Sequence, residues 1–291
     1  MKVGRETIKL LESLDIRYPD KYLYEFRGRS FVVKCGGSLM EDPSTGLAIL
    51  DDVALLKKEG INPVLVHGGS VQADREMEAA GIQPKRYKGL RHTCERTIEI
   101  LDRCFGALNS RIVEELKSRG ADAAGFSGAS GGGLIKADII RPDGVDIGLV
   151  GDMTGLNRPL WDSILNNQLP VVSSLGVSPQ GLTLNINADY VATKLALEIG
   201  ADKLILMTDV AGVMLDPKDP STLISSLTVS RARELIADGS IGSGMIPKIE
   251  SATRAIESGL KKIHMINGRV SHSLLLEIFT DHGVGTEIKP D

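Results

Sequence analysis

Residues 31–40, FVVKCGGSLM, form the stretch around which the rest of the chain is organised. An apolar, β-branched run leads to Lys34, then to the paired glycines Gly36 and Gly37, and then to Ser38. This order predicts a buried strand, a glycine turn and the start of a helix. Amide N–H groups at such a turn bind anions, phosphate above all, and Lys34 would add a positive charge beside the anion. The alternative is an ordinary turn with a surface lysine.

A second stretch repeats this pattern. Residues 63–67, PVLVH, predict another buried strand, and Gly68, Gly69 and Ser70 follow it. Parallel strands end at the same edge of a sheet, so the two glycine turns are expected to face one crevice. His67, at the end of this strand, is expected to hydrogen-bond and orient the turn, and a catalytic role is the alternative.

The composition excludes several classes of protein. Of the 291 residues, 42% are hydrophobic and 25% are charged, which is typical of a soluble globular protein with a buried core. The net charge is −4, and no apolar run approaches the roughly 20 residues that cross a membrane, so nothing indicates nucleic acid or a membrane as partner. The three cysteines form no C-x-x-C pair and the first residues are polar, so a cytoplasmic location is expected.

Residues 1–30 predict a helical extension ahead of the first strand. Ile8, Leu11 and Leu14 recur at helical spacing. Pro19 interrupts the pattern, and three aromatic residues follow it. The extension either caps the domain or packs on another subunit, and the sequence leaves both possibilities open.

From residue 31 onward, predicted strands and helices alternate, which is typical of an α/β fold with a central, mostly parallel sheet. The basic residues 85–93, KRYKGLRHT, predict a loop or hairpin. This segment is either a solvated surface turn or a carboxylate clamp built on Arg91, whose guanidinium binds carboxylate bidentately. Residues 142–144, PDG, predict a second hairpin, an antiparallel flap on the otherwise parallel sheet.

Polar residues follow the later strands. Asn185 and Asn187 alternate with apolar neighbours, so both amides are expected on one side of an extended segment. Asp189 opens the next helix, either as a plain N-cap or as a carboxylate that fixes lysines at a phosphoryl-transfer site. Thr208 and Asp209 end a very apolar strand, at the position where α/β sheets contact ligands.

Together these stretches resemble the amino-acid kinase family, and within it the N-acetylglutamate kinases. The matching segments run in family order as VVKCGGSLM, VLVHGGS, KGLRHT, NINADYVATKLA, KLILMTDVAGV, GSGMIPKIESA and LLLEIFTDHGVGTEI. The resemblance implies an open αβα sandwich with a central, mostly parallel sheet, formed as one continuous domain by residues 31–291. It further implies that residues 31–180 bind the acyl amino acid and that residues 181–291 bind ATP.

The activity that the resemblance implies is transfer of the γ-phosphoryl of ATP to the side-chain carboxylate of N-acetyl-L-glutamate. The product would be N-acetyl-L-glutamyl 5-phosphate, an intermediate of arginine biosynthesis. Such a transfer requires positioning and charge neutralisation from the protein. By resemblance, Lys34 and Lys248 flank the transferred group and Asp189 holds both lysines in place. Mg²⁺ would be carried by the ATP phosphates and water, with no metal site made by the protein.

Backbone and side-chain groups complete the site that the resemblance implies. The implied substrate contacts are Gly36, Gly37, Gly68, Gly69, Arg91, Asn185 and Asn187. The implied nucleotide contacts are Thr208, Asp209, Gly244 and Met245.

Two departures from the family pattern fall on the acyl-substrate side. Ser70 stands where the family usually has a third glycine, and residues 92–94, His-Thr-Cys, stand where it usually has Val-Thr-Asp. The first departure resembles relatives that phosphorylate an amino acid attached to an acidic carrier protein, which the basic segment 85–93 could bind. The alternatives are therefore a carrier-linked or related acidic amino acid, such as aminoadipate or glutamate, or a non-catalytic sensor of arginine or nucleotide.

Regulation by L-arginine is a further implication of the resemblance. Arginine-inhibited members carry an N-terminal helix ahead of the first strand, and helices of neighbouring dimers interlace in a hexamer. The chain is therefore expected to form a homodimer or a higher homo-oligomer and to act on small molecules. In this chain, Pro19 would break the helix that those members form. Inhibition by arginine and its absence therefore both stay open. The implied arginine site is lined by Lys203, His272, Glu277, Gly283 and Gly285.

Overall fold

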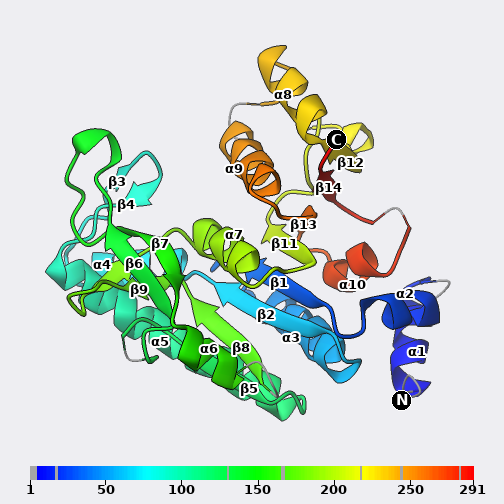
Figure 1. The fold of residues 1–291 in the computed structure, drawn as a ribbon, viewed down its shortest axis with the longest axis horizontal. Helices are drawn as coiled ribbons and strands as arrows, with labels where there is room; N and C mark the ends of the chain where they lie inside the picture. The colour runs from blue at the N-terminus through cyan, green and yellow to red at the C-terminus, as the bar shows by residue number, and fades with distance from the viewer. Residues whose placement is uncertain are drawn as a thin grey trace.

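The central feature of the fold is one large, twisted sheet (Figure 1). The computed structural model describes residues 5–16, 19–129, 131–164, 168–216, 218–242, 245–281 and 283–291. Among these residues the sheet has eight strands, in the order β12-β14-β13-β11-β1-β2-β8-β5. The neighbouring strands are parallel except β13 and β14, which pair antiparallel. The predicted α/β class with a mostly parallel sheet is confirmed.

The elements of this sheet and the helices around it have the following bounds. The strands are β1 Ser30–Cys35, β2 Asn62–His67, β5 Ala123–Phe126, β8 Leu169–Ser173, β11 Lys203–Thr208, β12 Ser226–Thr228, β13 Ile263–Asn267 and β14 Thr286–Lys289. The helices are α1 Arg5–Ser13, α2 Pro19–Phe26, α3 Pro43–Lys58, α4 Ser70–Ala79, α5 Glu95–Ser118, α6 Arg158–Ile164, α7 Ala188–Glu198, α8 Val229–Ala237, α9 Ile246–Glu257 and α10 Ser273–Ile278.

The sheet buries an apolar cluster on each face. Successive side chains of β1 point to opposite faces, so Val32 belongs to one cluster while Phe31 and Val33 belong to the other. Helices α6, α7, α8 and α9 contribute to the first cluster, and α1, α2, α3, α5 and α10 to the second. Full burial of each large apolar side chain is worth roughly 1.5–3 kcal/mol, so both faces hold the sheet in place.

The predicted hairpin around residues 142–144 forms, but not as a flap on the main sheet. It connects β6 (Ile135–Ile139) to β7 (Gly151–Leu156), which pair antiparallel. These two strands belong to a separate four-stranded sheet of order β10-β9-β6-β7, with β9 at Leu175–Val177 and β10 at Thr183–Asn185. The prediction of a flap on the parallel sheet was wrong because β9 and β10, each only three residues long, supply the partners. The basic segment forms a third, two-stranded sheet from β3 (Arg86–Tyr87) and β4 (Leu90–Arg91).

In the described part of residues 1–30, helices α1 and α2 pack against the domain. Leu11 of α1 and Leu23 of α2 are fully buried in the second apolar cluster. The ring of Phe26 packs edge-on against Phe31 of β1 at a centroid distance of 5.4 Å. Tyr24 points outward instead, with 85% of its surface exposed. Within the described ranges, none of the helices combines the length and the apolar character that a membrane crossing requires.

Two predicted helix starts differ from the structure, and the start of α9 fixes the position of Lys248. The turn after β1 continues past Ser38 to Asp42, whose side chain accepts a hydrogen bond from the backbone N–H of Ser44 (3.0 Å) and caps α3. Asn187, not Asp189, caps α7, because its extended backbone lets its Oδ1 accept from the N–H of Asp189 at 2.8 Å. Helix α9 begins at Ile246, so Lys248 lies in its first turn rather than in the loop before it.

Candidate active site

Two cavities meet at the C-terminal end of β1. The glycine-turn cavity has a volume of about 270 Å³ and is lined by both glycine turns, by Arg91 of β4 and by Asn185 of β10. The β11 cavity has a volume of about 510 Å³ and is lined by the end of β11 and by α7 and α9. Lys34, Gly36 and Asp189 border both cavities. A molecule in one cavity can therefore meet a molecule in the other beside Lys34.

The two glycine turns are in close contact with each other. A Cβ atom on Gly37 would lie 3.2 Å from the Cα of Gly69 and 3.3 Å from the backbone nitrogen of Ser70. A Cβ atom on Gly69 would lie only 2.6 Å from the ring of Phe105 on α5. A side chain is thus disfavoured at Gly37 and excluded at Gly69, and the backbone of both turns forms a wall of the glycine-turn cavity.

Lys34 is held by a carboxylate from the neighbouring helix. Its Nζ lies 2.9 Å from Oδ1 of Asp189, and the two side chains are 12% and 37% exposed. Lys248 lines the β11 cavity from α9 and is half-buried. Among the described residues Lys248 has no ion pair. The structure therefore brings the two lysines to one cavity, while Asp189 contacts Lys34 alone.

Arg91 is buried, with 6% of its surface exposed, and lines the glycine-turn cavity. Its Nη1 forms an ion pair with Asp74 of α4, and its Nη2 donates to the backbone carbonyl of Ser70 at 3.1 Å. Asn185 donates through Nδ2 to the hydroxyl of Thr93, two residues after Arg91. Two of the residues implied for the acyl substrate, Arg91 and Asn185, are therefore linked through Thr93, and Asp74 joins them as a partner that the sequence did not indicate.

His67 is a structural residue. It is fully buried, and burial lowers its pKa to about 4, so it is neutral near pH 7. Its Nδ1 lies 3.1 Å from the carbonyl of Gly68, and its Nε2 lies 3.0 Å from Nδ2 of Asn109 on α5. The ring hydrogen-bonds the glycine turn, as expected for a residue that orients it. Asn109 was missed because nothing in its local sequence indicates a buried amide.

The residues implied for the nucleotide are only partly brought together. Thr208 and Asp209 line the β11 cavity, where the hydroxyl of Thr208 also donates to the carbonyl of Val210 at 2.9 Å. Met245 packs against the first apolar cluster and does not appear in the cavity wall. Gly244 lies outside the described residues.

Additional residues in the wall of the β11 cavity follow from helical spacing. Ser251 lies three residues after Lys248 on α9, and Thr193 lies four residues after Asp189 on α7. Residues three or four apart lie on one face of a helix, so Ser251 and Thr193 line the same cavity as Lys248 and Asp189. This spacing indicates cavity residues only when the boundaries of the two helices are known.

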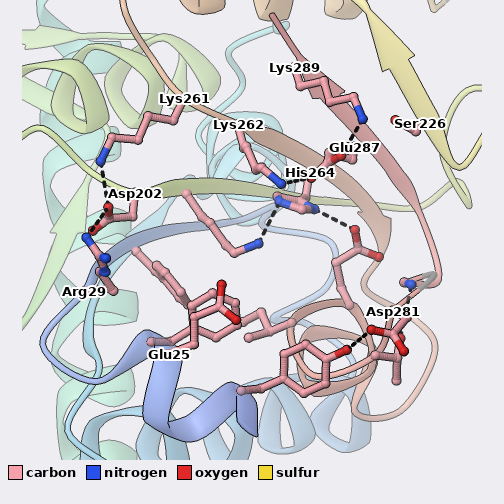
Figure 2. A pocket seen from close by; sticks show the side chains of 18 of the residues that line it. Glu25, Arg29, Asp202, Ser226, Lys261, Lys262, His264, Asp281, Glu287 and Lys289 are labelled. Carbon is pink, nitrogen blue, oxygen red and sulfur yellow. Dashed lines mark hydrogen bonds and ion pairs between the residues drawn. The ribbon is translucent and has the colours of Figure 1, made fainter.

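A third cavity, the N-terminal cavity, has a volume of about 630 Å³ and lies beneath α2, with Tyr22 and Phe26 in its wall. Figure 2 shows this cavity with His264 at its centre. Lys203 Nζ lies 3.3 Å from Nε2 of His264, whose Nδ1 lies 2.7 Å from Oε1 of Glu277. Three residues implied for arginine line this cavity, namely Lys203, Glu277 and Gly283.

The other two residues implied for arginine lie elsewhere. His272 has a left-handed backbone (φ 56°) and pairs with the buried Asp52 of α3, with Nδ1 2.6 Å from Oδ1. Gly285 donates its N–H to Oε2 of Glu277 at 2.9 Å and lies behind that carboxylate. His272 is turned away because it precedes α10 whereas Glu277 lies within it.

The structure holds no metal cluster in its described part. Over these residues, no group of three or more His, Cys, Asp and Glu side chains is placed to hold a metal ion. In the shared wall of the two cavities, the carboxylate of Asp189 is already paired with Lys34.

Comparisons with known proteins agree with this geometry. A model of the amino acid kinase family matches residues 29–267. The acetylglutamate kinase of Methanocaldococcus jannaschii is 42% identical over 300 residues, covering 99% of this chain and 100% of that protein. The acetylglutamate kinase of Aquifex aeolicus is 44% identical over 283 residues, covering 92% of this chain and 94% of that protein.

Solved structures show the same fold. N-acetylglutamate synthase of Neisseria gonorrhoeae, complexed with coenzyme A and N-acetyl-glutamate, matches with a TM-score of 0.82 at 27% identity. The match covers 96% of this chain and 63% of the synthase, so the chain spans less than two thirds of that protein. The same synthase complexed with coenzyme A and L-arginine matches with a TM-score of 0.80 at 25% identity, covering 96% of this chain and 65% of that one. The chain therefore belongs to the amino acid kinase family.

Proposed function

We propose that the protein phosphorylates the side-chain carboxylate of N-acetyl-L-glutamate with ATP, giving N-acetyl-L-glutamyl 5-phosphate for arginine biosynthesis in the cytoplasm. The observation that carries this proposal is the meeting of two cavities beside Lys34 and Asp189. The glycine-turn cavity takes the acyl amino acid, mainly within residues 31–180, and the β11 cavity takes ATP, mainly within residues 181–291. Acetylglutamate kinases match the chain over nearly its whole length.

The chemistry follows from the charges at this junction. A carboxylate oxygen of the substrate attacks the γ-phosphorus, the bond to the bridging oxygen breaks, and ADP leaves with that electron pair. Lys34 and Lys248 neutralise the phosphoryl oxygens from two walls, and the amides of the glycine turns add hydrogen bonds. Mg²⁺ enters with ATP, held by its phosphates and water, and neutralises their charge. Asp189 keeps Lys34 at the junction.

The two departures from the family pattern leave the substrate contacts in place. Ser70 contacts Arg91 through its backbone carbonyl, which any residue supplies. Thr93 is retained within residues 92–94, and its hydroxyl meets Asn185. Cys94 takes the N-cap position of α5, where its side chain makes no capping hydrogen bond. These substitutions therefore favour the same class of small acyl amino acid.

The charges of the basic segment argue against an acidic carrier protein as the substrate. Arg86 and Arg91 both pair with Asp74, and Lys88 pairs with Asp143 at 2.6 Å. Three of the four basic side chains at positions 85, 86, 88 and 91 thus pair with two carboxylates of the protein itself, which offset half of the segment's four positive charges. Less positive charge is therefore left to attract an acidic partner.

A coupled assay of ADP release separates these possibilities. The protein is supplied with MgATP and, in turn, N-acetyl-L-glutamate, N-acetylaminoadipate, glutamate and aspartate. N-acetyl-L-glutamate is expected to give the highest kcat/KM of the four. A higher kcat/KM for another acid would reassign the substrate, and no turnover with any of them would leave a carrier-linked acid or the sensor.

Arg91→Lys tests the assignment of the substrate's α-carboxylate. Lysine keeps the charge but not the planar fork that binds a carboxylate through two parallel hydrogen bonds. We expect KM for the acyl amino acid to rise about tenfold or more, on the scale of one charge-assisted hydrogen bond. KM for ATP should stay nearly unchanged, because Arg91 lines only the glycine-turn cavity of the two. Equal rises in both constants, measured by steady-state kinetics, would place Arg91 elsewhere.

We further propose that L-arginine binds in the N-terminal cavity and inhibits the enzyme. The supporting observation is that Lys203, Glu277 and Gly283 meet there under α2. Glu277 accepts hydrogen bonds from His264 and from two backbone N–H groups, so it supplies negative charge to the cavity. Tyr24, exposed on α2, offers a contact for another subunit in a homodimer or hexamer.

Lys203→Met tests this regulatory proposal. The variant keeps the apolar stem and removes the charge at the start of β11, about 17 Å along the strand from its active-site end. We expect the concentration of arginine that halves activity to rise about tenfold or more, with kcat in the absence of arginine unchanged. Light scattering reports whether arginine changes the oligomer. A wild-type enzyme indifferent to millimolar arginine would refute regulation and leave the kinase assignment intact.

A further inference from the structure

Two carboxylates anchor the β3–β4 hairpin to the rest of the protein. Asp74 of α4 pairs with Arg86, with Oδ2 2.8 Å from Nη2, and with Arg91 through its other oxygen. Asp143, in the connection between β6 and β7, pairs with Lys88 at 2.6 Å. Asp74 thus contacts the residue assigned to the substrate, and Asp143 anchors the same hairpin from its other side.

We infer that Asp74 is a positioning residue, which fixes the guanidinium of Arg91 so that its remaining edge receives the α-carboxylate of the acyl amino acid. The inference rests on the proposed function, because Arg91 binds that carboxylate there. Asp74 itself touches no substrate and acts through Arg91.

The hydrogen bonds of Arg91 define which edge of its guanidinium is left to bind the substrate. Nη1 donates to Asp74 and to the sulfur of Met77 at 3.3 Å, and Nη2 donates one proton to the carbonyl of Ser70. Within the described part of the chain, the Nε proton and the second Nη2 proton have no partner. Nε and Nη2 lie on the same edge of the guanidinium, which binds a carboxylate through two parallel hydrogen bonds. Asp74, on the opposite side, keeps the group from rotating away.

Because the guanidinium of Arg91 is buried, it needs Asp74 as a negatively charged partner. The side chain of Arg91 is 5% exposed, and a buried cation without a counter-charge strongly destabilises a protein. Asp74 is 27% exposed and supplies that counter-charge before substrate arrives. Burial alone would raise the pKa of Asp74, but hydrogen bonds from Arg91 and Arg86 outweigh burial and hold it below the ordinary value, so Asp74 is ionised at neutral pH.

A kinetic comparison of full-length variants tests the inference. Asp74→Ala is expected to raise KM for N-acetyl-L-glutamate about tenfold to hundredfold, the scale of one charge-assisted hydrogen bond. The kcat and KM for ATP should change less than about twofold, because the groups at Lys34 are untouched. Asp74→Asn keeps the shape of the side chain and one acceptor oxygen, so a smaller rise in KM for N-acetyl-L-glutamate is expected. This variant tests the inference even if Asp74→Ala folds poorly.

A matched control and a double variant distinguish positioning of Arg91 from general anchoring of the β3–β4 hairpin. Asp143→Ala removes the other anchor of the hairpin and should leave KM for N-acetyl-L-glutamate within about twofold of wild type. In Asp74→Ala/Arg91→Ala, KM should equal that of Arg91→Ala alone, because Asp74 acts through Arg91.

Three results would each overturn the inference. The first is an unchanged KM in both Asp74 variants, and the second is an equal rise in Asp143→Ala. The third is additive effects in the double variant. Failure of the wild-type enzyme to phosphorylate N-acetyl-L-glutamate is a different result, which would refute the proposed function instead.

Discussion

Replacing Lys34 or Lys248 with alanine is expected to lower kcat about 10²–10³-fold and to leave KM for the acyl amino acid nearly unchanged. The reason is that charge on the transferred phosphoryl group is redistributed most in the transition state, so the loss of a preorganised cation falls on kcat. Lys34 borders both cavities and Lys248 lines the β11 cavity, which places them on two walls of the junction. Steady-state kinetics with saturating ATP measures both constants.

Lys194→Ala is the matched control for this prediction. Lys194 lies on α7 near Asp189, but its Nζ points to Asp152 at 3.6 Å and its side chain is 49% exposed. An exposed ion pair is worth at most about 1 kcal/mol, so kcat should be close to wild type. A near-normal kcat in Lys34→Ala or Lys248→Ala would remove that lysine from the mechanism.

Gly69→Ala is expected to damage both stability and catalysis. The new methyl group would lie 2.6 Å from the ring of Phe105, which is itself buried at 2% exposure. Overpacking of this kind typically costs about 1–3 kcal/mol of unfolding free energy. The turn must shift to relieve the clash, and a displacement of about 1 Å at a reacting centre can cost about 10²-fold in rate. Chemical denaturation and kcat measure the two effects.

Gly106→Ala provides the control, because it introduces the same methyl group beside the same aromatic residue. Gly106 lies inside α5, and a Cβ atom there would meet nothing within 4 Å in the described structure. Alanine is a better helix former than glycine by about 1 kcal/mol, so this variant should be more stable than wild type with unchanged kcat. A Gly69→Ala enzyme with normal stability and activity would mean that Phe105 and the turn after β2 can move apart at little cost.

Local sequence was sufficient for the elements that carry a strong pattern. The buried strand before each glycine turn was predictable because continuous β-branched residues and a following glycine pair leave few alternatives. The long helix α5 carries apolar residues at helical spacing over its 24 residues, which is a pattern that predicts a helix. Strands β9 and β12 were missed because three residues cannot establish a period of two.

Details of the site depended on contacts that sequence alone does not reveal. Asn187 and Asp189 are equally suitable caps, and the extended backbone at Asn187 decided between them. Asp74 and Asn109 were missed because their partners, Arg91 and His67, lie far away in sequence. The family resemblance placed His272 with Glu277, but its left-handed backbone turns it toward Asp52.

Trapping of the product with hydroxylamine tests the central claim most directly. An acyl phosphate reacts with hydroxylamine to give a hydroxamate, and mass spectrometry of the fragments shows which carboxylate has reacted. With MgATP and N-acetyl-L-glutamate, the protein should form one side-chain hydroxamate per ADP released, and the Lys34→Ala variant should form about 10²–10³-fold less per unit time. Release of ADP without hydroxamate, or a hydroxamate on the α-carboxylate, would contradict phosphorylation of the side-chain carboxylate.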